Sequence, residues 1–194
     1  MKRNKILILN GHPDKESLNN ALSNAYVEVS EDSNAKVSVI NIADLKFNPN
    51  LKYGYRKKTE LEPDLLYAIE KIKAANHIVW FFPMWWYGYP AIMKGFIDRV
   101  FLPGITFKFE KGKTIHEKLL MGKSGHIIVT ADSPKWYNNL FMKIPAINQL
   151  KKGTMKFCGI SPVKVSYIGP LKNSSSDFRN KWLMKMKKLG KQNK

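Results

Sequence analysis

The sequence predicts a doubly wound α/β domain in which five parallel strands carry helices on both faces. Five short apolar runs alternate with segments of helical spacing, the order that builds a parallel sheet. The 194 residues, 44% of them hydrophobic, suffice for one well-buried core. No internal repeat and no linker divides the chain, so we expect residues 1–194 to form a single domain.

The first quarter of the chain predicts a strand, a helix and a second strand. Residues 5–9 (KILIL) form an apolar run typical of a strand buried on both faces. The turn-forming segment NGHPDKES follows, and Ser17 is a candidate N-cap for the next helix. That helix is predicted from apolar residues at helical spacing: Leu18, Ala21, Leu22, Ala25, Tyr26 and Val29. A second strand is expected at residues 36–41 and an irregular loop at 42–60.

The centre of the chain predicts the third strand between two helices. A helix is expected to begin near Pro63, with Leu65, Ile69 and Ile72 on one face. Residues 77–82 form the third apolar run. Pro83 is expected to end it because proline cannot donate to a strand ladder. Pro90 then suits the first position of a helix over residues 90–101, since its φ is fixed near the helical value.

The second half of the chain predicts two further strands, each followed or preceded by a loop. The elements expected in order are an excursion of little regular structure (102–123), a strand (125–130), the loop ADSPKWYNN, a helix from about 145 to 157 ended by Gly159, a strand (163–168) and a helix from about 176 to 189. The last helix is expected to bury Phe178, Trp182 and Leu189 and to expose Lys181, Lys185 and Lys188.

Two loops are expected to meet at one place in this sheet. For five parallel strands the flavodoxin-like order 2-1-3-4-5 is the common solution, and ligands bind where the order reverses, between strands 1 and 3. The loops at that gap are NGHPDKESLN after the first strand and PMWWYGYP after the third. A binding site is therefore predicted between them.

The second of these loops is rich in aromatic residues. Trp85, Trp86 and Tyr87 lie between Pro83 and Pro90, and aromatic side chains there favour a flat, stacking ligand. Aromatic residues near a strand end are often simply core. Three of them within five residues, on a loop bounded by prolines, favour a ligand wall.

The first loop ends at a helix N-terminus, which offers unpaired amides and a positive dipole end to a phosphate. His12, Ser17 and Asn19 can add side-chain donors. The competing interpretation is that Ser17 only caps the helix and that His12 is a turn residue. The loop is neither a GxGxxG fingerprint nor a P-loop, and GxSxG and HExxH motifs are absent from the sequence. A phosphate-binding loop beside an aromatic wall fits a phosphorylated flat ring such as a flavin, with Thr130, Ala131 and Asp132 as a third wall.

Two sequence blocks carry a family resemblance. FPMWWYGYPAIMKGFIDRVF, together with GHPDKESLNNAL, resembles the NAD(P)H:quinone oxidoreductases of the flavodoxin-like superfamily, the DT-diaphorase-like family. The likeness covers most of the chain. The resemblance implies a bound flavin, FAD rather than the alternative FMN, with NAD(P)H as co-substrate. It also implies a homodimer with active sites at the subunit interface, where hydride passes to a quinone or similar electrophile in ping-pong fashion.

The resemblance assigns roles to residues of this chain. It implies that His12, Ser17, Leu18 and Asn19 hold the phosphate end of the flavin, and that the isoalloxazine lies along Pro83, Met84, Trp85, Trp86 and Tyr87. Tyr137 matches an active-site tyrosine of the family and is the candidate catalytic residue. Two departures stand out: the family's TTGG loop is replaced by Thr130-Ala131-Asp132-Ser133, and Lys143 stands where a histidine would follow.

The net charge of +18 is the unusual feature of the composition. Such a field attracts nucleic acids, anionic lipids or phosphorylated small molecules. No zinc-finger or RNP pattern supports nucleic-acid binding, and association with an anionic membrane is expected to be weak and peripheral. An ancillary, nucleotide-binding subunit of a membrane partner is the alternative function. One cysteine, Cys158, and no signal or membrane-spanning stretch predict a soluble, cytoplasmic protein without a cysteine-based metal site.

Overall fold

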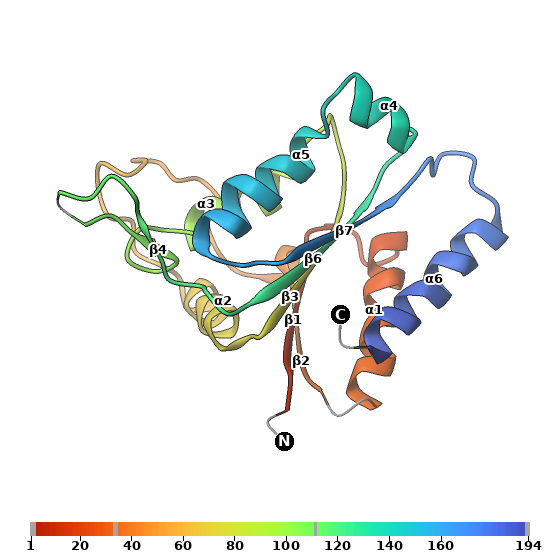
Figure 1. The fold of residues 1–194 in the computed structure, drawn as a ribbon, viewed down its shortest axis with the longest axis horizontal. Helices are drawn as coiled ribbons and strands as arrows, with labels where there is room; N and C mark the ends of the chain where they lie inside the picture. The colour runs from red at the N-terminus through yellow and green to blue at the C-terminus, as the bar shows by residue number, and fades with distance from the viewer. Residues whose placement is uncertain (1–2, 33–34, 111, 193–194) are drawn as a thin grey trace.

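A five-stranded parallel sheet forms the centre of the computed structural model, which describes residues 3–32, 35–110 and 112–192. Its strands, in the spatial order β2-β1-β3-β6-β7, are β2 (Lys36–Asn41), β1 (Lys5–Asn10), β3 (His77–Pro83), β6 (Ser124–Thr130) and β7 (Val163–Ile168). Two-residue strands β4 (Phe107–Lys108) and β5 (Glu117–Lys118) pair separately in the 102–123 excursion. The predicted fold and the order 2-1-3-4-5 are confirmed (Figure 1).

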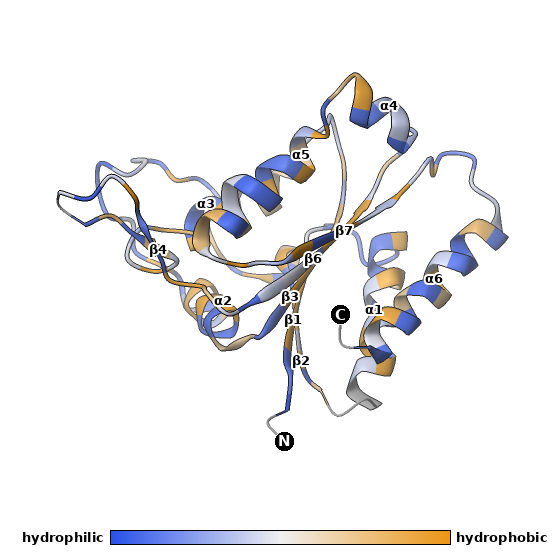
Figure 2. Cartoon of the chain, in the orientation of Figure 1, coloured by the Kyte–Doolittle hydropathy of each residue, from blue (hydrophilic) through white to orange (hydrophobic). Residues whose placement is uncertain are grey.

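Helices cover both faces of the sheet. On one face α1 (Leu18–Asp32) packs against α6 (Ser176–Lys191), and the opposite face carries α2, α3 and α5 (Figure 1). Their bounds are α2 (Pro63–Ala74), α3 (Ala91–Val100) and α5 (Pro145–Asn148), and short 3-10 turn η1 (Ile42–Asp44) follows β2. α6 is largely hydrophilic with interspersed hydrophobic residues (Figure 2), as expected for a helix with one face against α1.

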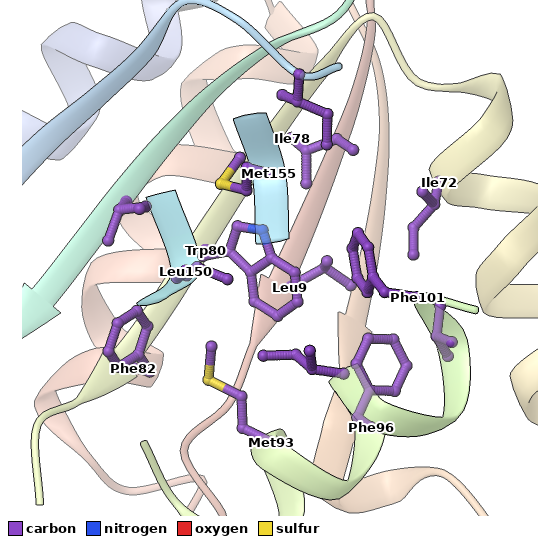
Figure 3. Packing of buried hydrophobic residues seen from close by; sticks show 14 of the residues in the cluster. Leu9, Ile72, Ile78, Trp80, Phe82, Met93, Phe96, Phe101, Leu150 and Met155 are labelled. Carbon is purple, nitrogen blue, oxygen red and sulfur yellow. The ribbon is translucent and has the colours of Figure 1, made fainter. Parts of the chain in front are cut away.

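The third strand is the axis of the core. All seven residues of β3 are buried, and Pro83 is its last residue, as predicted. On the α2/α3 side, Trp80 lies edge-on to Phe96, with ring centroids 6.3 Å apart, and 6.2 Å from Phe101 (Figure 3). Phe81, on the other face, lies edge-on to Tyr26 of α1, with ring centroids 6.2 Å apart. A strand buried on both faces explains the unbroken apolar run in the sequence.

One prediction about the second half of the chain was wrong, and another was confirmed with a different helix type. Part of ADSPKWYNN, expected as a loop, forms α4 (Lys135–Leu140) with Pro134 at its N-cap. Trp, Tyr and Asn are weak helix formers, so this helix depends on tertiary contacts, above all on fully buried Asn138. The helix expected over 145–157 is confirmed in extent: α5 runs without a break into η2 (Gln149–Lys156), a stretch of π-helix.

Two helical faces also differ from their predictions. Ala21, expected on the inner face of α1, is exposed, whereas Asn19 is buried. In α6 Phe178, Trp182 and Leu189 are only half-buried, and Met186 provides the buried contact. Asn19 lies on the inner face because its side chain donates a hydrogen bond to Thr130 of β6. Among the described residues, no helix is long and apolar enough to cross a membrane.

Candidate functional site

A hollow of about 180 Å³ opens at the carboxyl ends of β1, β3 and β6, where the strand order reverses. It is lined by His12, Ser17, Leu18, Asn19, Pro83, Met84, Trp85, Thr130, Ala131, Asp132 and Leu171. The structure thus brings together all the residues predicted to bind a cofactor except Trp86 and Tyr87. Leu171 was missed, since nothing in the sequence distinguishes it from a core leucine after β7.

Hydrogen bonds within the β1–α1 loop indicate the protonation state and the tautomer of His12. The Asp14 amide donates to His12 Nδ1 at 3.0 Å, and the His12 amide donates to Asn10 Oδ1 at 3.1 Å. Burial lowers the pKa of His12, against the opposing charge and backbone hydrogen bond of Asp14. The ring is therefore neutral at pH 7, and because Nδ1 accepts, the proton lies on Nε2. His12 can donate one hydrogen bond to an anion in the hollow.

The start of α1 supplies further donors. Ser17 Oγ accepts from the Asn20 amide at 3.2 Å, which confirms the predicted N-cap, and also donates to the Asp14 carbonyl at 2.7 Å. The helix begins at Leu18, so the first-turn amides have no intrahelical acceptor. Ser17 and the two residues after it all line the hollow, so the capped end of α1 faces it.

Asn19 links the two sides of the hollow. Its side chain is 2% exposed, and Nδ2 donates to Thr130 Oγ1 at 2.7 Å across 111 residues of sequence. Its Oδ1 has no hydrogen-bond partner among the described residues. A buried acceptor without a partner is costly. A ligand N–H or O–H in the hollow would satisfy it.

The aromatic loop is a strained two-residue turn. Trp85 and Gly88 exchange backbone hydrogen bonds of 3.1 and 2.8 Å, and both central residues are left-handed, Trp86 at φ 48° and Tyr87 at φ 59°. Non-glycine residues in this region store strain, which clusters at ligand-binding sites. Trp85 lies edge-on to His12, with centroids 5.5 Å apart, whereas Trp86 is 98% exposed beyond the rim. The predicted flavin contacts of Trp86 and Tyr87 stay predictions.

A buried polar network holds the third wall. Asn138 Nδ2 donates to Ser133 Oγ at 2.6 Å and to Tyr167 Oη at 2.5 Å, and Tyr167 donates to the Ser133 carbonyl at 2.6 Å. Gly169 permits this wall to approach, because a Cβ there would lie 2.6 Å from the Ala131 carbonyl oxygen. The network ties Ser133, in the loop after β6, to α4 and to the end of β7. Sequence reasoning missed it, because its members are ordinary polar residues far apart in the chain.

Tyr137, the predicted catalytic residue, lies on α4 and does not line the hollow. Its ring is half-exposed and contacts Trp136 and Phe141, with centroids 6.0 and 5.2 Å away. Lys143 is exposed and left-handed at φ 53°. The Ala146 amide, just after it, donates to the Tyr87 carbonyl at 3.1 Å, so the segment after α4 is tied to the aromatic turn. The catalytic role of Tyr137 stays a prediction.

The geometry combines anion-binding donors with aromatic surface. His12, the first turn of α1 and Asn19 offer donors and one acceptor, and the aromatic turn stands opposite them. Within the described residues no group of three His, Cys, Asp or Glu side chains could hold a metal ion. The donors of the hollow suit an anion, and the aromatic turn suits a flat ring.

Comparisons with known proteins agree with this geometry. The family model described as a flavodoxin-like fold matches residues 4–189. An NAD(P)H oxidoreductase of Haemophilus influenzae, described as uncharacterized, is 28% identical over 85% of this chain and 83% of its own length. NAD(P)H dehydrogenase (quinone) 1 of Cavia porcellus is 26% identical over 95% of this chain and 75% of its own length.

Two solved structures resemble the chain along nearly its whole length. The crystal structure of Smu.1420 from Streptococcus mutans has a TM-score of 0.83 and 29% identity, covering 97% of this chain and 99% of that one. An FMN-dependent NADH-azoreductase of Bacillus anthracis, in complex with FMN, has a TM-score of 0.76 and 18% identity, covering 98% and 99%. Because the family model spans nearly all of the sequence, the chain belongs to the flavodoxin-like family and is an oxidoreductase of its NAD(P)H:quinone oxidoreductase group.

Proposed function

We propose that this chain is a flavin-dependent NAD(P)H oxidoreductase that passes hydride to quinones or similar electrophiles by a ping-pong route. The observation that carries the proposal is the hollow between His12, the start of α1 and the aromatic turn, at the reversal of strand order. Flat phosphorylated ligands suit such a place in an open α/β sheet. The names of the relatives, an NAD(P)H oxidoreductase and a quinone dehydrogenase, support the reaction class.

The residues present fit a flavin. The neutral His12 Nε2–H and the first-turn amides of α1 suit its phosphate, and the buried Asn19 Oδ1 lacks a donor that a polyol hydroxyl could supply. The hollow, at about 180 Å³, is smaller than pockets that enclose whole ligands, so it holds only part of a flavin. The remainder would extend past Trp85 toward the exposed Trp86.

When bound, the flavin would supply the hydride chemistry. The chain's own residues would bind and orient: the β1–α1 loop fixes the phosphate, and the rigid Trp85–Gly88 turn presents aromatic surface. Tyr137, held on α4 through Asn138, would donate a hydrogen bond to the acceptor. Lys143, in place of a neutral or protonated histidine, offers a fixed positive charge, so we expect the acceptor preference to differ from that of the relatives.

Two flavins remain alternatives. The β1–α1 loop favours FAD by resemblance, and the azoreductase with bound FMN supports FMN. A visible spectrum of the purified protein, followed by mass analysis of the released cofactor, distinguishes them. Failure to bind either flavin in a titration would refute the oxidoreductase proposal.

Turnover separates the enzyme from the alternative of an ancillary subunit. An enzyme is expected to oxidise NADH or NADPH steadily with a quinone acceptor, and initial rates at several quinone concentrations should give the parallel reciprocal plots of a ping-pong reaction. Slow turnover together with salt-sensitive binding to a membrane partner would favour the ancillary role.

We further propose a cytoplasmic homodimer. The exposed apolar side chains around the site support an interface, since Trp86, Trp136, Leu140 and Phe141 are each at least 60% exposed. Sedimentation at dilute concentration as a fully active 22.3 kDa monomer would refute the dimer.

The +18 charge supports weak association with anionic membranes. We expect the protein to pellet with anionic vesicles but not with neutral vesicles, and added salt should reverse this binding.

A further inference from the structure

A second cavity lies away from the hollow, between the 51–61 loop and the turn at residues 102–105. Its volume is about 440 Å³, within the range of small-molecule pockets, and it shares no lining residue with the hollow. A Cβ added at Gly54 or Gly104, both in its wall, would meet no atom within 4 Å. Neither glycine is therefore packed against another part of the described chain.

The lining has apolar walls and a cationic wall. Leu51, Leu61, Leu102 and Ile105 provide apolar surface, and the charged residues in the wall are Lys57, Lys58 and Arg99. No Asp or Glu is among them. The 51–61 loop that carries the lysines has an excess of positive charge, since Lys52, Arg56, Lys57 and Lys58 outnumber its single acidic residue, Glu60.

Arg99 is built into the back of this cavity. Its side chain is 1% exposed, and its NH2 group donates to Glu62 Oε2 at 2.8 Å and to the Glu60 carbonyl at 2.7 Å. Another donation, to the Asn48 carbonyl, ties the loop to α3. Glu62 balances the charge of Arg99, so Lys57 and Lys58 are the cations of the wall that have no carboxylate partner within the described part of the chain.

Two buried polar atoms in the same wall are unsatisfied. Arg99 Nε and Thr59 Oγ1 have no hydrogen-bond partner in the described part of the chain. Buried donors of this kind usually have partners. A pair of them beside two lysines, within a cavity of mixed apolar and cationic lining, is the arrangement expected of an anion subsite.

We propose that this cavity binds a small aromatic carboxylate. The carboxylate lies at Lys57 and Lys58, next to Thr59 and Arg99, and the ring packs on the leucines and Ile105. An apolar body distinguishes this ligand from inorganic anions, which the +18 charge would attract anywhere on the surface. The charge distinguishes it from neutral aromatic compounds, which gain nothing from the lysines.

Benzoate titrated into the flavin-loaded protein by calorimetry tests the site. We expect saturable binding of one benzoate per chain, at least tenfold tighter than that of benzyl alcohol or inorganic phosphate. Replacing both cavity lysines, Lys57→Gln with Lys58→Gln, should weaken benzoate binding at least tenfold. Lys52→Gln is the matched control, because Lys52 and Lys57 both lie over the Tyr53 ring, at 5.6 and 5.2 Å, but only Lys57 lines the cavity.

A crystal soaked with 4-bromobenzoate locates the ligand by the bromine signal. Bromine in this cavity supports the proposal. Bromine only in the flavin hollow, equal binding by the double variant, or phosphate binding as tight as benzoate overturns it. A second copy that covers Lys57 and Lys58 and excludes benzoate would overturn it as well.

Discussion

Replacing Trp86 separates a ligand-binding role from a structural one. Trp86 is 98% exposed on the strained turn, whereas Trp80, six residues earlier, is fully buried among Phe96 and Phe101. Both are tryptophans of the same segment, so Trp80→Ala is a matched control. We expect Trp86→Ala to weaken flavin and acceptor binding while leaving the fold intact.

The magnitudes follow from burial and backbone conformation. Truncating a fully buried Trp80 leaves a cavity and is expected to lower the free energy of unfolding by about 3–5 kcal/mol. The Trp86 side chain is almost fully exposed, so its truncation leaves no cavity. Alanine at this position would adopt the same left-handed backbone, at φ 48°. Trp86→Gly would relieve roughly 1 kcal/mol of backbone strain, offset by the greater entropy of the unfolded glycine chain.

The assay uses flavin-free protein for stability and flavin-loaded protein for function. Urea unfolding followed by far-ultraviolet circular dichroism should show Trp86→Ala within about 0.5 kcal/mol of the wild type. Flavin affinity or kcat/KM should fall about tenfold for each 1.4 kcal/mol of lost interaction. If the apoprotein unfolds readily while its folded fraction keeps normal flavin affinity and kinetics, Trp86 supports the fold and the ligand-wall interpretation is refuted.

Three further predictions concern residues inside the fold. Burial, with nearby His126 and Lys164, lowers the pKa of His77 to about 4. Below pH 6.5 the unfolded chain therefore binds a proton at this residue that the native state does not bind, and the free energy of unfolding should fall by roughly 3 kcal/mol between pH 6.5 and 4. Urea unfolding at several pH values should show this slope, and His77→Asn should flatten it. Glu62→Gln keeps one acceptor for Arg99 but removes its counter-charge, and should lower the free energy of unfolding by about 3 kcal/mol. An unchanged thermal midpoint would refute this expectation. Asn138→Ala should lower it by about 1–3 kcal/mol and raise the acceptor KM without loss of flavin, whereas the exposed neighbour change Asn139→Ala should alter neither.

The sheet could be predicted because its signal is local. Each strand is a short apolar run, and a strand buried on both faces needs only apolar residues in sequence. The observed β3 and β6 differ from the predicted 77–82 and 125–130 by one residue each. Strand order followed from the number of strands and the rule for doubly wound sheets. The approximate place of the site came with it.

The contacts inside the site could not be predicted, because they join distant residues. Asn19 meets Thr130 across 111 residues, and Asn138 meets Tyr167 across 29. The sequence gives no period or spacing for such pairs. The same contacts explain two errors: Asn19 turns the inner face of α1 away from Ala21, and Asn138 holds the segment 135–140 as a helix despite weak propensity.

In the aromatic turn, the residue types do not match the preference of the backbone conformation that they adopt. A turn with two left-handed central residues ordinarily selects Asn-Gly, which tolerates positive φ. Here Trp86 and Tyr87 occupy those positions, held by the Trp85–Gly88 hydrogen bonds and by the Ala146 amide on the Tyr87 carbonyl. Local preference is broken where two bulky rings are placed at the rim of a hollow, and remote backbone contacts compensate for the strain. Because such conflicts concentrate at functional sites, the turn is the strongest structural argument that the aromatic residues serve a ligand rather than the core.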